Sequence, residues 1–383
     1  MSTLSTVCDD LPADWRSATL LGRLQLREGP LPIAIVAGRV RDLSRHAATL
    51  SEVVSNWRGV APAGSDLGPL EEFSLTRAYE SEPAVRLLAP FDLQCIKACG
   101  VTFAVSAVER VIEERARGNA DQAQSIRSAL SARVGADIRS VQPGSDSAAR
   151  LKEALIADGL WSQYLEVAIG PDAEVFTKSP PLSSVGWGDW IGIRPDSHWN
   201  NPEPEIVLAC DRHGKTLGAT LGNDVNLRDI EGRSALLLGK AKDNTGSCAI
   251  GPFIRMFDDT FNIDDVRNAV VSLEVLGEDN FNLQGESSMA LISRDPLDLV
   301  RQTLSHHDYP DGFALFLGTM FAPSQDRDTA GRGFTHKVGD TVRVSSEKLG
   351  TLVNKVTTCD RVPAWAFGIG DLMRNLAGRN LLT

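Results

Sequence analysis

The sequence predicts an α+β fold, in which strand-rich regions lie on either side of a helical insertion. Residues 18–42 contain short alternating apolar stretches separated by the turn sequences EGP and AGR, a pattern typical of strands joined by tight turns. Residues 105–117 instead repeat apolar side chains at helical spacing with charged residues between them, which indicates an amphipathic helix. From about residue 171 to residue 295 the strand pattern returns. Strands and helices are therefore grouped in separate parts of the chain.

Two domains of unequal size are expected. The first strands and a helix predicted over residues 44–57 form a small N-terminal α+β domain, residues 1–80, and residues 81–383 form the larger domain. Further helical stretches follow residues 105–117 and extend the insertion to about residues 103–170. This insertion is either a lid or dimer contact, or a set of ordinary packing helices.

The composition argues against two classes of partner. The net charge of −11 and the pI near 5.1 disfavour a nucleic-acid ligand, because no surface is expected to carry the positive surplus that displaces counterions. No apolar stretch approaches the roughly 18 residues of a spanning helix, and the N-terminal sequence lacks the basic and apolar regions of a secretory signal. The six cysteines are scattered without a CxxC pair, which favours a reducing compartment. We therefore expect a cytoplasmic protein without a nucleic-acid or membrane partner.

The stretch between residues 196 and 243 carries the clearest chemical signal. Glu203 and Glu205 are separated by one residue, so a strand sends both carboxylates to the same face. If residues 213–214 form a two-residue hairpin loop, the numbers of facing residues sum to 427 and Glu203 stands opposite Asp224. Three clustered carboxylates repel one another unless a hard divalent cation binds, and oxygen ligands suit Mg²⁺ or Mn²⁺. The alternative is that these acids end their strands and face solvent.

Further positions could contact a ligand. Lys240 and Lys242 flank a small residue, and a lysine beside such a cation could orient a carboxylate substrate or stabilise an enolate oxygen, although most lysines are solvated surface charges. Gly318 and Thr319 end a buried strand and offer a backbone N–H and a hydroxyl to a carboxylate. Arg228 either bridges to a nearby aspartate or binds substrate. No GxSxG, GxxxxGK[ST] or GxGxxG motif is present, which argues against serine hydrolases, nucleotide hydrolases and dinucleotide dehydrogenases.

These residues lie in motifs that resemble the fumarylacetoacetate hydrolase superfamily over about residues 175–356. The motifs FTKSPP, PEPE, GNDVNLRD, GKAKD, CAIGP, LGT, VGD and LGTLVNKV occur in the family's order. The strings GVTFAVSAVERVIEERARG and DSHWNNPEPE are similar to its bacterial sugar-acid branch, the 2-keto-3-deoxy-pentonate dehydratases. The resemblance implies a mixed β-sandwich roll that binds Mg²⁺ or Mn²⁺ and forms a homodimer or homotetramer. It further implies that the metal ligands are Glu203, Glu205 and Asp224. The substrate would be a small 2-oxo sugar acid, with Lys240 and Thr319 beside it.

One departure from the family pattern bears on the reaction. Hydrolases of this superfamily resemble one another in a lid segment of the form GLNYxxHxxE, whose His and Glu activate the attacking water. In the aligned stretch, residues 100–109, Ser106 replaces the histidine while Glu109 remains. A serine without a nearby base cannot generate hydroxide at neutral pH, so hydrolysis is disfavoured.

The resemblance therefore implies an elimination. The expected reaction is metal-dependent dehydration of a 2-keto-3-deoxy-D-pentonate, of the xylonate or arabinonate type, to 2-oxoglutarate semialdehyde. The candidate catalytic residues are Glu109, Lys240 and Ser106; either Glu109 or Lys240 would remove the C3 proton, and which group is acid and which is base is open. The alternative is an acylpyruvase-type hydrolase that cleaves a 2,4-diketo acid to pyruvate and a second acid.

Overall fold

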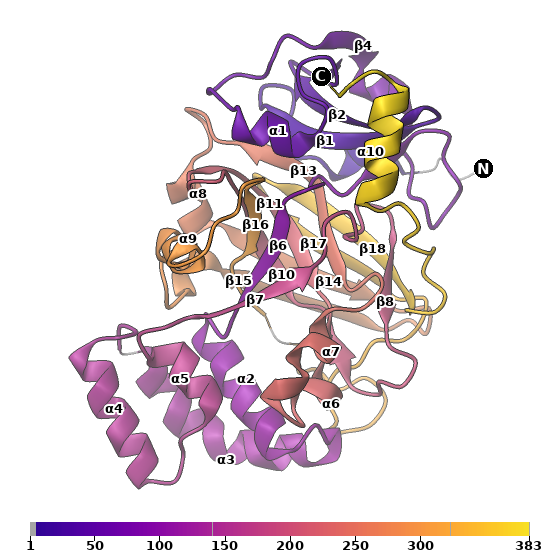
Figure 1. The fold of residues 1–383 in the computed structure, drawn as a ribbon. Helices are drawn as coiled ribbons and strands as arrows, with labels where there is room; N and C mark the ends of the chain where they lie inside the picture. The colour runs from indigo at the N-terminus through magenta and orange to yellow at the C-terminus, as the bar shows by residue number, and fades with distance from the viewer. Residues whose placement is uncertain (1–4, 140, 322, 383) are drawn as a thin grey trace.

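The structure is a computed structural model that describes residues 5–139, 141–321 and 323–382. Two β-sheets occupy the centre, the N-terminal strands and helix α10 lie at one end, and a group of helices lies at the other end (Figure 1). This arrangement confirms the predicted α+β class, with a mixed β-sandwich and a helical insertion. Within the described residues, no helix combines the length and the apolar character that crossing a membrane requires.

In the described part of the chain, the larger sheet has eleven strands in the order β4-β3-β2-β1-β13-β11-β10-β16-β6-β7, with β5 paired to β1. Neighbouring strands are antiparallel except β16 and β6, which are parallel. Its strands are β1 (Leu20–Leu26), β2 (Gly29–Val36), β3 (Arg39–Asp42), β4 (Ser65–Pro69), β5 (Arg86–Leu88), β6 (Cys95–Gly100), β7 (Glu174–Ser179), β10 (Pro204–Cys210), β11 (Thr216–Asp224), β13 (Cys248–Met256) and β16 (Phe313–Phe316).

The second sheet, five-stranded within the described residues, has the order β15-β14-β17-β18-β8. Along β17 buried and half-buried residues alternate, so one face of this sheet turns inward. Leu273 and Val344 from that face share a hydrophobic core with Leu208 and Leu221 of the larger sheet. The strands are β8 (Trp190–Ile193), β14 (Val270–Leu276), β15 (Asn282–Ser288), β17 (Thr341–Ser346) and β18 (Gly350–Thr358), while β9 (Asn200–Asn201) pairs with β12 (Asn226–Leu227).

The predicted helical insertion is present as four consecutive helices, α2 to α5, which pack around a core of their own (Figure 1). Helix α2 also contacts α6, which lies close to the end of β11. The insertion is therefore joined to the sheet at the position where the hairpin carboxylates are expected. The α-helices are α1 (Leu50–Ser55), α2 (Ala104–Arg115), α3 (Ala120–Arg139), α4 (Asp146–Ala157), α5 (Gln163–Ile169), α6 (Arg228–Glu231), α7 (Leu238–Lys242), α8 (Ile263–Asn268), α9 (Pro296–Leu304) and α10 (Ile369–Gly378).

The N-terminal strands extend the larger sheet, because β1 pairs with β13 through Leu20 opposite Arg255 and Leu21 opposite Ile254. Helix α10 closes this end of the molecule, and the side-chain amide of Asn375 donates a 2.7 Å hydrogen bond to the carbonyl of Glu28. The domain boundary expected at residue 80 stays a prediction. The helix expected over residues 44–57 is shorter than predicted and begins only after Thr49, whose hydroxyl accepts from the Glu52 amide.

Candidate active site

The hairpin of β10 and β11 has the predicted register. Pro204 faces Asn223 and Glu205 faces Gly222, and the Asp224 amide donates a 3.0 Å hydrogen bond to the Glu203 carbonyl. The predicted two-residue loop is wrong, because the Asp211 amide bonds the Lys215 carbonyl and leaves three residues in the loop. The loop is one residue longer than predicted, and a β-bulge between Ala209 and Cys210 compensates for that residue. From Ala209 back to Pro204 the strands therefore pair in the predicted register.

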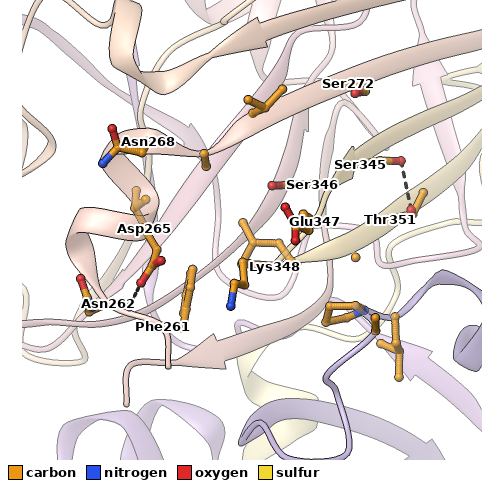
Figure 2. A pocket seen from close by; sticks show the side chains of 18 of the residues that line it. Phe261, Asn262, Asp265, Asn268, Ser272, Ser345, Ser346, Glu347, Lys348 and Thr351 are labelled. Atoms are coloured by element: carbon orange, nitrogen blue, oxygen red, sulfur yellow. Dashed lines mark hydrogen bonds between the residues drawn. The ribbon is translucent and has the colours of Figure 1, made fainter. Parts of the chain in front are cut away.

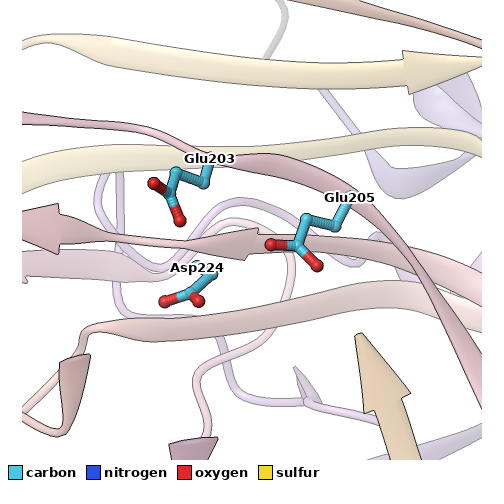
Figure 3. A group of neighbouring side chains, drawn as sticks. All are labelled: Glu203, Glu205 and Asp224. Atoms are coloured by element: carbon cyan, nitrogen blue, oxygen red, sulfur yellow. The ribbon is translucent and has the colours of Figure 1, made fainter. Parts of the chain in front are cut away.

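The three hairpin carboxylates converge at one point (Figure 3). One carboxylate oxygen from each of Glu203, Glu205 and Asp224 lies within 4.8 Å of the others. The three residues are 4%, 1% and 2% exposed. Three carboxylates packed this closely without water require cationic compensation, because both burial and mutual repulsion oppose their charge.

Protein cations compensate two of these carboxylates directly. Lys242 Nζ pairs with Glu203 and lies 3.2 Å from Asp224 Oδ2. Lys178 Nζ lies 2.7 Å from Asp224 Oδ1 and is fully buried. Arg110, from helix α2, bonds the other oxygen of Glu203. Burial acts to raise the pKa of Glu203, but Lys242 and Arg110 outweigh it and hold that pKa below its usual value.

Glu205 is compensated less completely. Its Oε2 accepts a 2.7 Å hydrogen bond from the Gly318 amide, and no lysine or arginine of the described chain lies within ion-pair distance of it. Burial, Asp224 and Glu203 raise the pKa of Glu205 well above its usual value. A hard divalent cation bound by three carboxylate oxygens supplies the charge that this residue lacks, so the donor set fits Mg²⁺ or Mn²⁺.

The lysine at the carboxylate cluster is Lys242 and not Lys240, and the substrate contact expected of Lys240 stays a prediction. Lys240 is exposed, whereas Lys242 is 3% exposed and turned inward. Both belong to the short helix α7. Successive helical residues are rotated by about 100°, so two residues separated by one position face nearly opposite directions. The sequence GKAK alone does not show which lysine turns inward.

The two lid residues singled out from the sequence do not form a water-activating pair. The Ser106 hydroxyl donates a 2.8 Å hydrogen bond to the Phe103 carbonyl at the start of α2. Glu109 is held by two hydrogen bonds from Arg127, at 2.9 and 2.7 Å. Burial acts to raise the pKa of Glu109, but Arg127 and Arg228 outweigh it and lower that pKa. Glu109 is thus a weak base that is already paired with Arg127, and it does not line the cavity beside the carboxylates.

That cavity is narrow, with a volume of about 10 Å³. Among its lining residues, Glu174 at the start of β7 is a further acid that the sequence analysis missed. Burial and Glu231 raise its pKa to about 7, although Arg110 and Lys242 act in the opposite direction. The available signal was the alternation along β7, which places Glu174 on the same face as Lys178. The cavity is lined by Cys99, Gly100, Val101, Ser106, Arg110, Glu174, Phe176, Glu203, Glu205, Asp224, Glu231, Lys242 and Thr319.

The remaining predicted residues divide between the cavity and its surroundings. Thr319 lines the cavity, and its hydroxyl donates to the Phe321 carbonyl at 3.1 Å. Gly318 supports Glu205 as described. Arg228 does not line the cavity: its Nε lies 3.2 Å from Glu113, and its Nη1 donates to the Pro323 carbonyl at 3.1 Å. In place of the predicted bridge to a neighbouring aspartate, Arg228 forms a buried pair with Glu113 of helix α2.

A larger surface pocket, of about 710 Å³, lies away from these residues, between α8 and the turn that joins β17 to β18 (Figure 2). Some of its polar side chains contact one another or nearby backbone: Asp265 accepts from the Asn262 amide, and the hydroxyls of Ser345 and Thr351 lie 3.0 Å apart. This pocket contains none of the predicted site residues and no grouping of acids comparable with the hairpin cluster among the described residues.

Comparison with known proteins places this geometry in context. A family model described as fumarylacetoacetate (FAA) hydrolase, C-terminal, matches residues 171–357. The chain is 31% identical over 183 residues to the 2-dehydro-3-deoxy-D-arabinonate dehydratase of Saccharolobus solfataricus, covering 48% of this chain and 58% of that protein. It is 32% identical over 210 residues to a probable 2-keto-3-deoxyxylonate dehydratase of Haloferax volcanii, covering 55% of this chain and 68% of that protein.

Solved structures share the fold. A 2-keto-3-deoxy-D-arabinonate dehydratase complexed with magnesium and 2,5-dioxopentanoate superposes with a TM-score of 0.64 at 21% identity, covering 88% of this chain and 99% of that one. A fumarylacetoacetate hydrolase from Exiguobacterium antarcticum superposes with a TM-score of 0.56 at 16% identity, covering 89% of this chain and 100% of that one. At these identities the superpositions establish the fold.

Proposed function

The chain belongs to the fumarylacetoacetate hydrolase family, and we propose that it is a divalent-metal-dependent hydro-lyase that removes water from a 2-keto-3-deoxy-D-pentonate. The product of that reaction is 2-oxoglutarate semialdehyde, which is the same compound as 2,5-dioxopentanoate. The observation that carries the proposal is the arrangement of one cavity: three convergent carboxylates, a lysine and a glutamate of raised pKa, with no water-activating pair among the residues that line it. The names of both curated relatives agree with it.

Glu203, Glu205 and Asp224 would hold the cation, Mg²⁺ or Mn²⁺. When bound there, a divalent cation supplies Lewis-acid polarisation of the substrate's 2-oxo group, which makes the C3 protons more acidic. Lys242 lies against the same carboxylates and lines the cavity. Its charge would stabilise negative charge that develops on the 2-oxo oxygen. Burial alone would lower the pKa of Lys242, but Asp224 and Glu203 raise it, so Lys242 acts as a cation and not as a base.

Glu174 is the group best suited to move the proton. A pKa of about 7 allows it to take a proton and to return one at neutral pH. In the proposed reaction Glu174 removes a C3 proton, the C3–H electrons form a C3=C4 double bond, and the C4–O bond breaks as Glu174 protonates the departing hydroxyl. The enone that remains loses a C5 proton and gains one at C3, which gives the C4=C5 enol. That enol loses its O–H proton and gains one at C4, which yields the semialdehyde. Glu174 replaces Glu109 and Lys240 in this role.

The alternative hydrolase activity lacks support from the cavity. Hydrolysis of a 2,4-diketo acid needs an activated water, and Ser106 and Glu109 are both engaged elsewhere. Thr319, which lines the cavity, is retained as a proposed substrate contact. The proposed homodimer or homotetramer stays a prediction, as does a cytoplasmic location.

Substrate and metal dependence test the proposal. In the substrate, C4 is the only stereocentre, so the derivatives of D-xylonate and D-arabinonate are one compound. The D-enantiomer, the L-enantiomer and a 2,4-diketo acid are each incubated with Mg²⁺ and, in parallel, with a chelator. We expect turnover of the D-enantiomer that stops on chelation and returns when Mg²⁺ is restored. Turnover of the diketo acid alone would contradict the dehydratase proposal and favour hydrolysis.

A further inference from the structure

Arg110 is the only arginine among the residues that line the catalytic cavity, and it comes from the lid helix α2. Its side chain is 8% exposed and lies among three glutamates. Nη2 bonds Glu203 of the metal-binding cluster, and Nη1 lies 2.5 Å from Glu113 and 2.8 Å from Glu231. Arg110 thus connects the lid directly to one proposed metal ligand.

A movement of α2 would keep some contacts of Arg110 and break others. Glu113 lies one turn further along α2 and moves with Arg110, whereas Glu203 belongs to strand β10 of the larger sheet. Glu203 is also paired with Lys242. A divalent cation at the cluster would repel the guanidinium and share the charge of Glu203, so the contact between Arg110 and Glu203 is the one that metal binding weakens.

The cavity has to widen before a substrate can enter. A volume of about 10 Å³ is close to the space of a single water and excludes a five-carbon acid. Ser106 and Arg110 of α2 line the cavity, so widening on that side separates Arg110 from Glu203. Once Arg110 leaves Glu203, its Nη1 keeps Glu113 and Glu231, whereas its Nη2 loses the carboxylate that it contacts.

We propose that Arg110 recognises the carboxylate of the 2-oxo acid substrate, exchanging its bond to Glu203 for one to the incoming carboxylate as the cation occupies the cluster. The exchange replaces one carboxylate by another, so the buried guanidinium remains compensated throughout. A neutral group could not take that place. This inference rests on the proposed function, since it identifies how the same cavity selects an acidic 2-oxo compound.

Matched ligands test the recognition. Pyruvate and its neutral amide, pyruvamide, differ in charge at the position that Arg110 would contact. Isothermal titration calorimetry in saturating Mg²⁺ compares their Kd values for the wild type, Arg110→Met and Arg110→Lys. Arg110→Met should weaken pyruvate binding about 10- to 100-fold and leave pyruvamide binding within about twofold. Arg110→Lys should also weaken pyruvate binding, because an ammonium lacks the two-pronged geometry. Arg115→Met, on the exposed side of α2, is the control and should bind both ligands as the wild type does.

A second titration separates recognition from a purely structural role. Mg²⁺ alone is titrated into each variant, and thermal unfolding is recorded beside it. Arg110→Met should bind Mg²⁺ at least as tightly as the wild type, because a competing cation has been removed. The proposal is overturned if Mg²⁺ and pyruvate binding weaken by the same factor, since Arg110 would then act only by positioning Glu203. It is equally overturned if both Arg110 variants bind pyruvate like the wild type. Wild-type protein that binds no Mg²⁺ would instead contradict the proposed function itself.

Discussion

Glu174 lies opposite Gly100 in the pairing of β7 with β6, and its carboxylate occupies the space that a Cβ at position 100 would need. Gly100 therefore makes room for the proposed acid–base residue. Gly100→Ala should displace the carboxylate and lower kcat by about 100-fold, because a displacement near 1 Å has an effect of that order. Mg²⁺ affinity should persist, since the hairpin is untouched. Gly378→Ala, at a helical glycine with nothing within 4 Å, is the control. Unchanged kcat in Gly100→Ala would argue against Glu174 as the proton-transfer group.

The two lysines of α7 provide a matched pair. Lys242→Met should lower kcat about 100- to 1000-fold, because it removes the cation nearest the developing oxyanion. Lys240→Met changes an exposed side chain two positions away and should leave kcat and KM unchanged. Steady-state kinetics at saturating Mg²⁺ decide between them. A large loss in Lys240→Met with an active Lys242→Met would reverse the assignment.

The raised pKa of Glu174 predicts a pH dependence of activity. The proposed base is the carboxylate, so kcat/KM should rise with pH and level off above about 7. Glu174→Gln should abolish turnover at every pH while pyruvate still binds. A kcat/KM profile whose acidic limb lies near the usual pKa of a glutamate would contradict the assignment.

The raised pKa of Glu174 also affects stability, which should fall with pH where activity rises. Because the folded pKa lies above the unfolded one, Glu174 contributes stability that is complete below about 4.5 and is lost as the pH rises through about 7. Between these two pH values the free energy of unfolding of the wild type, measured without Mg²⁺, should therefore fall relative to that of Glu174→Gln. Urea unfolding at several pH values measures it, and a difference that does not vary with pH would show that burial does not raise this pKa.

Glu203→Gln tests the ligand assignment. It removes one charge from the cluster and leaves Lys242 and Arg110 without their shared partner. Mg²⁺ affinity and activity should fall together, by about 100-fold or more, since even outer partners of metal ligands contribute 10- to 100-fold. Full activity at an unchanged Mg²⁺ requirement would exclude Glu203 as a ligand.

The sequence predicted those features that depend on the spacing of residues within one strand, hairpin or helix. The spacing of Glu203 and Glu205 placed both on one face of a strand, and the constant sum of facing residue numbers in a hairpin placed Asp224 opposite Glu203. The register was predicted in this way, although the loop length and the bulge were not. The helical insertion followed from its spacing of apolar residues in the same way. Both signals are contained within a few turns or one hairpin, and so neither depends on distant packing.

Three features of the site were not predicted because they depend on distant packing. Choosing Lys242 over Lys240 requires the orientation of a single turn of helix, α7, against the hairpin. Glu174 enters the cavity because β7 pairs with β6, strands separated in sequence by the whole helical insertion. Arg110 and Arg228 meet their glutamates only once α2 and α6 are in contact. Long-range strand pairing and helix docking are not written in any one stretch of sequence.

The most direct test of the central claim is the identity of the product. Wild-type protein is incubated with 2-keto-3-deoxy-D-xylonate and Mg²⁺, and 2-oxoglutarate semialdehyde and pyruvate are measured separately against substrate consumed. We expect one semialdehyde for each substrate molecule, no pyruvate, and loss of the semialdehyde in Glu174→Gln. Formation of pyruvate with glycolaldehyde would show carbon–carbon cleavage in place of dehydration, and would contradict the account.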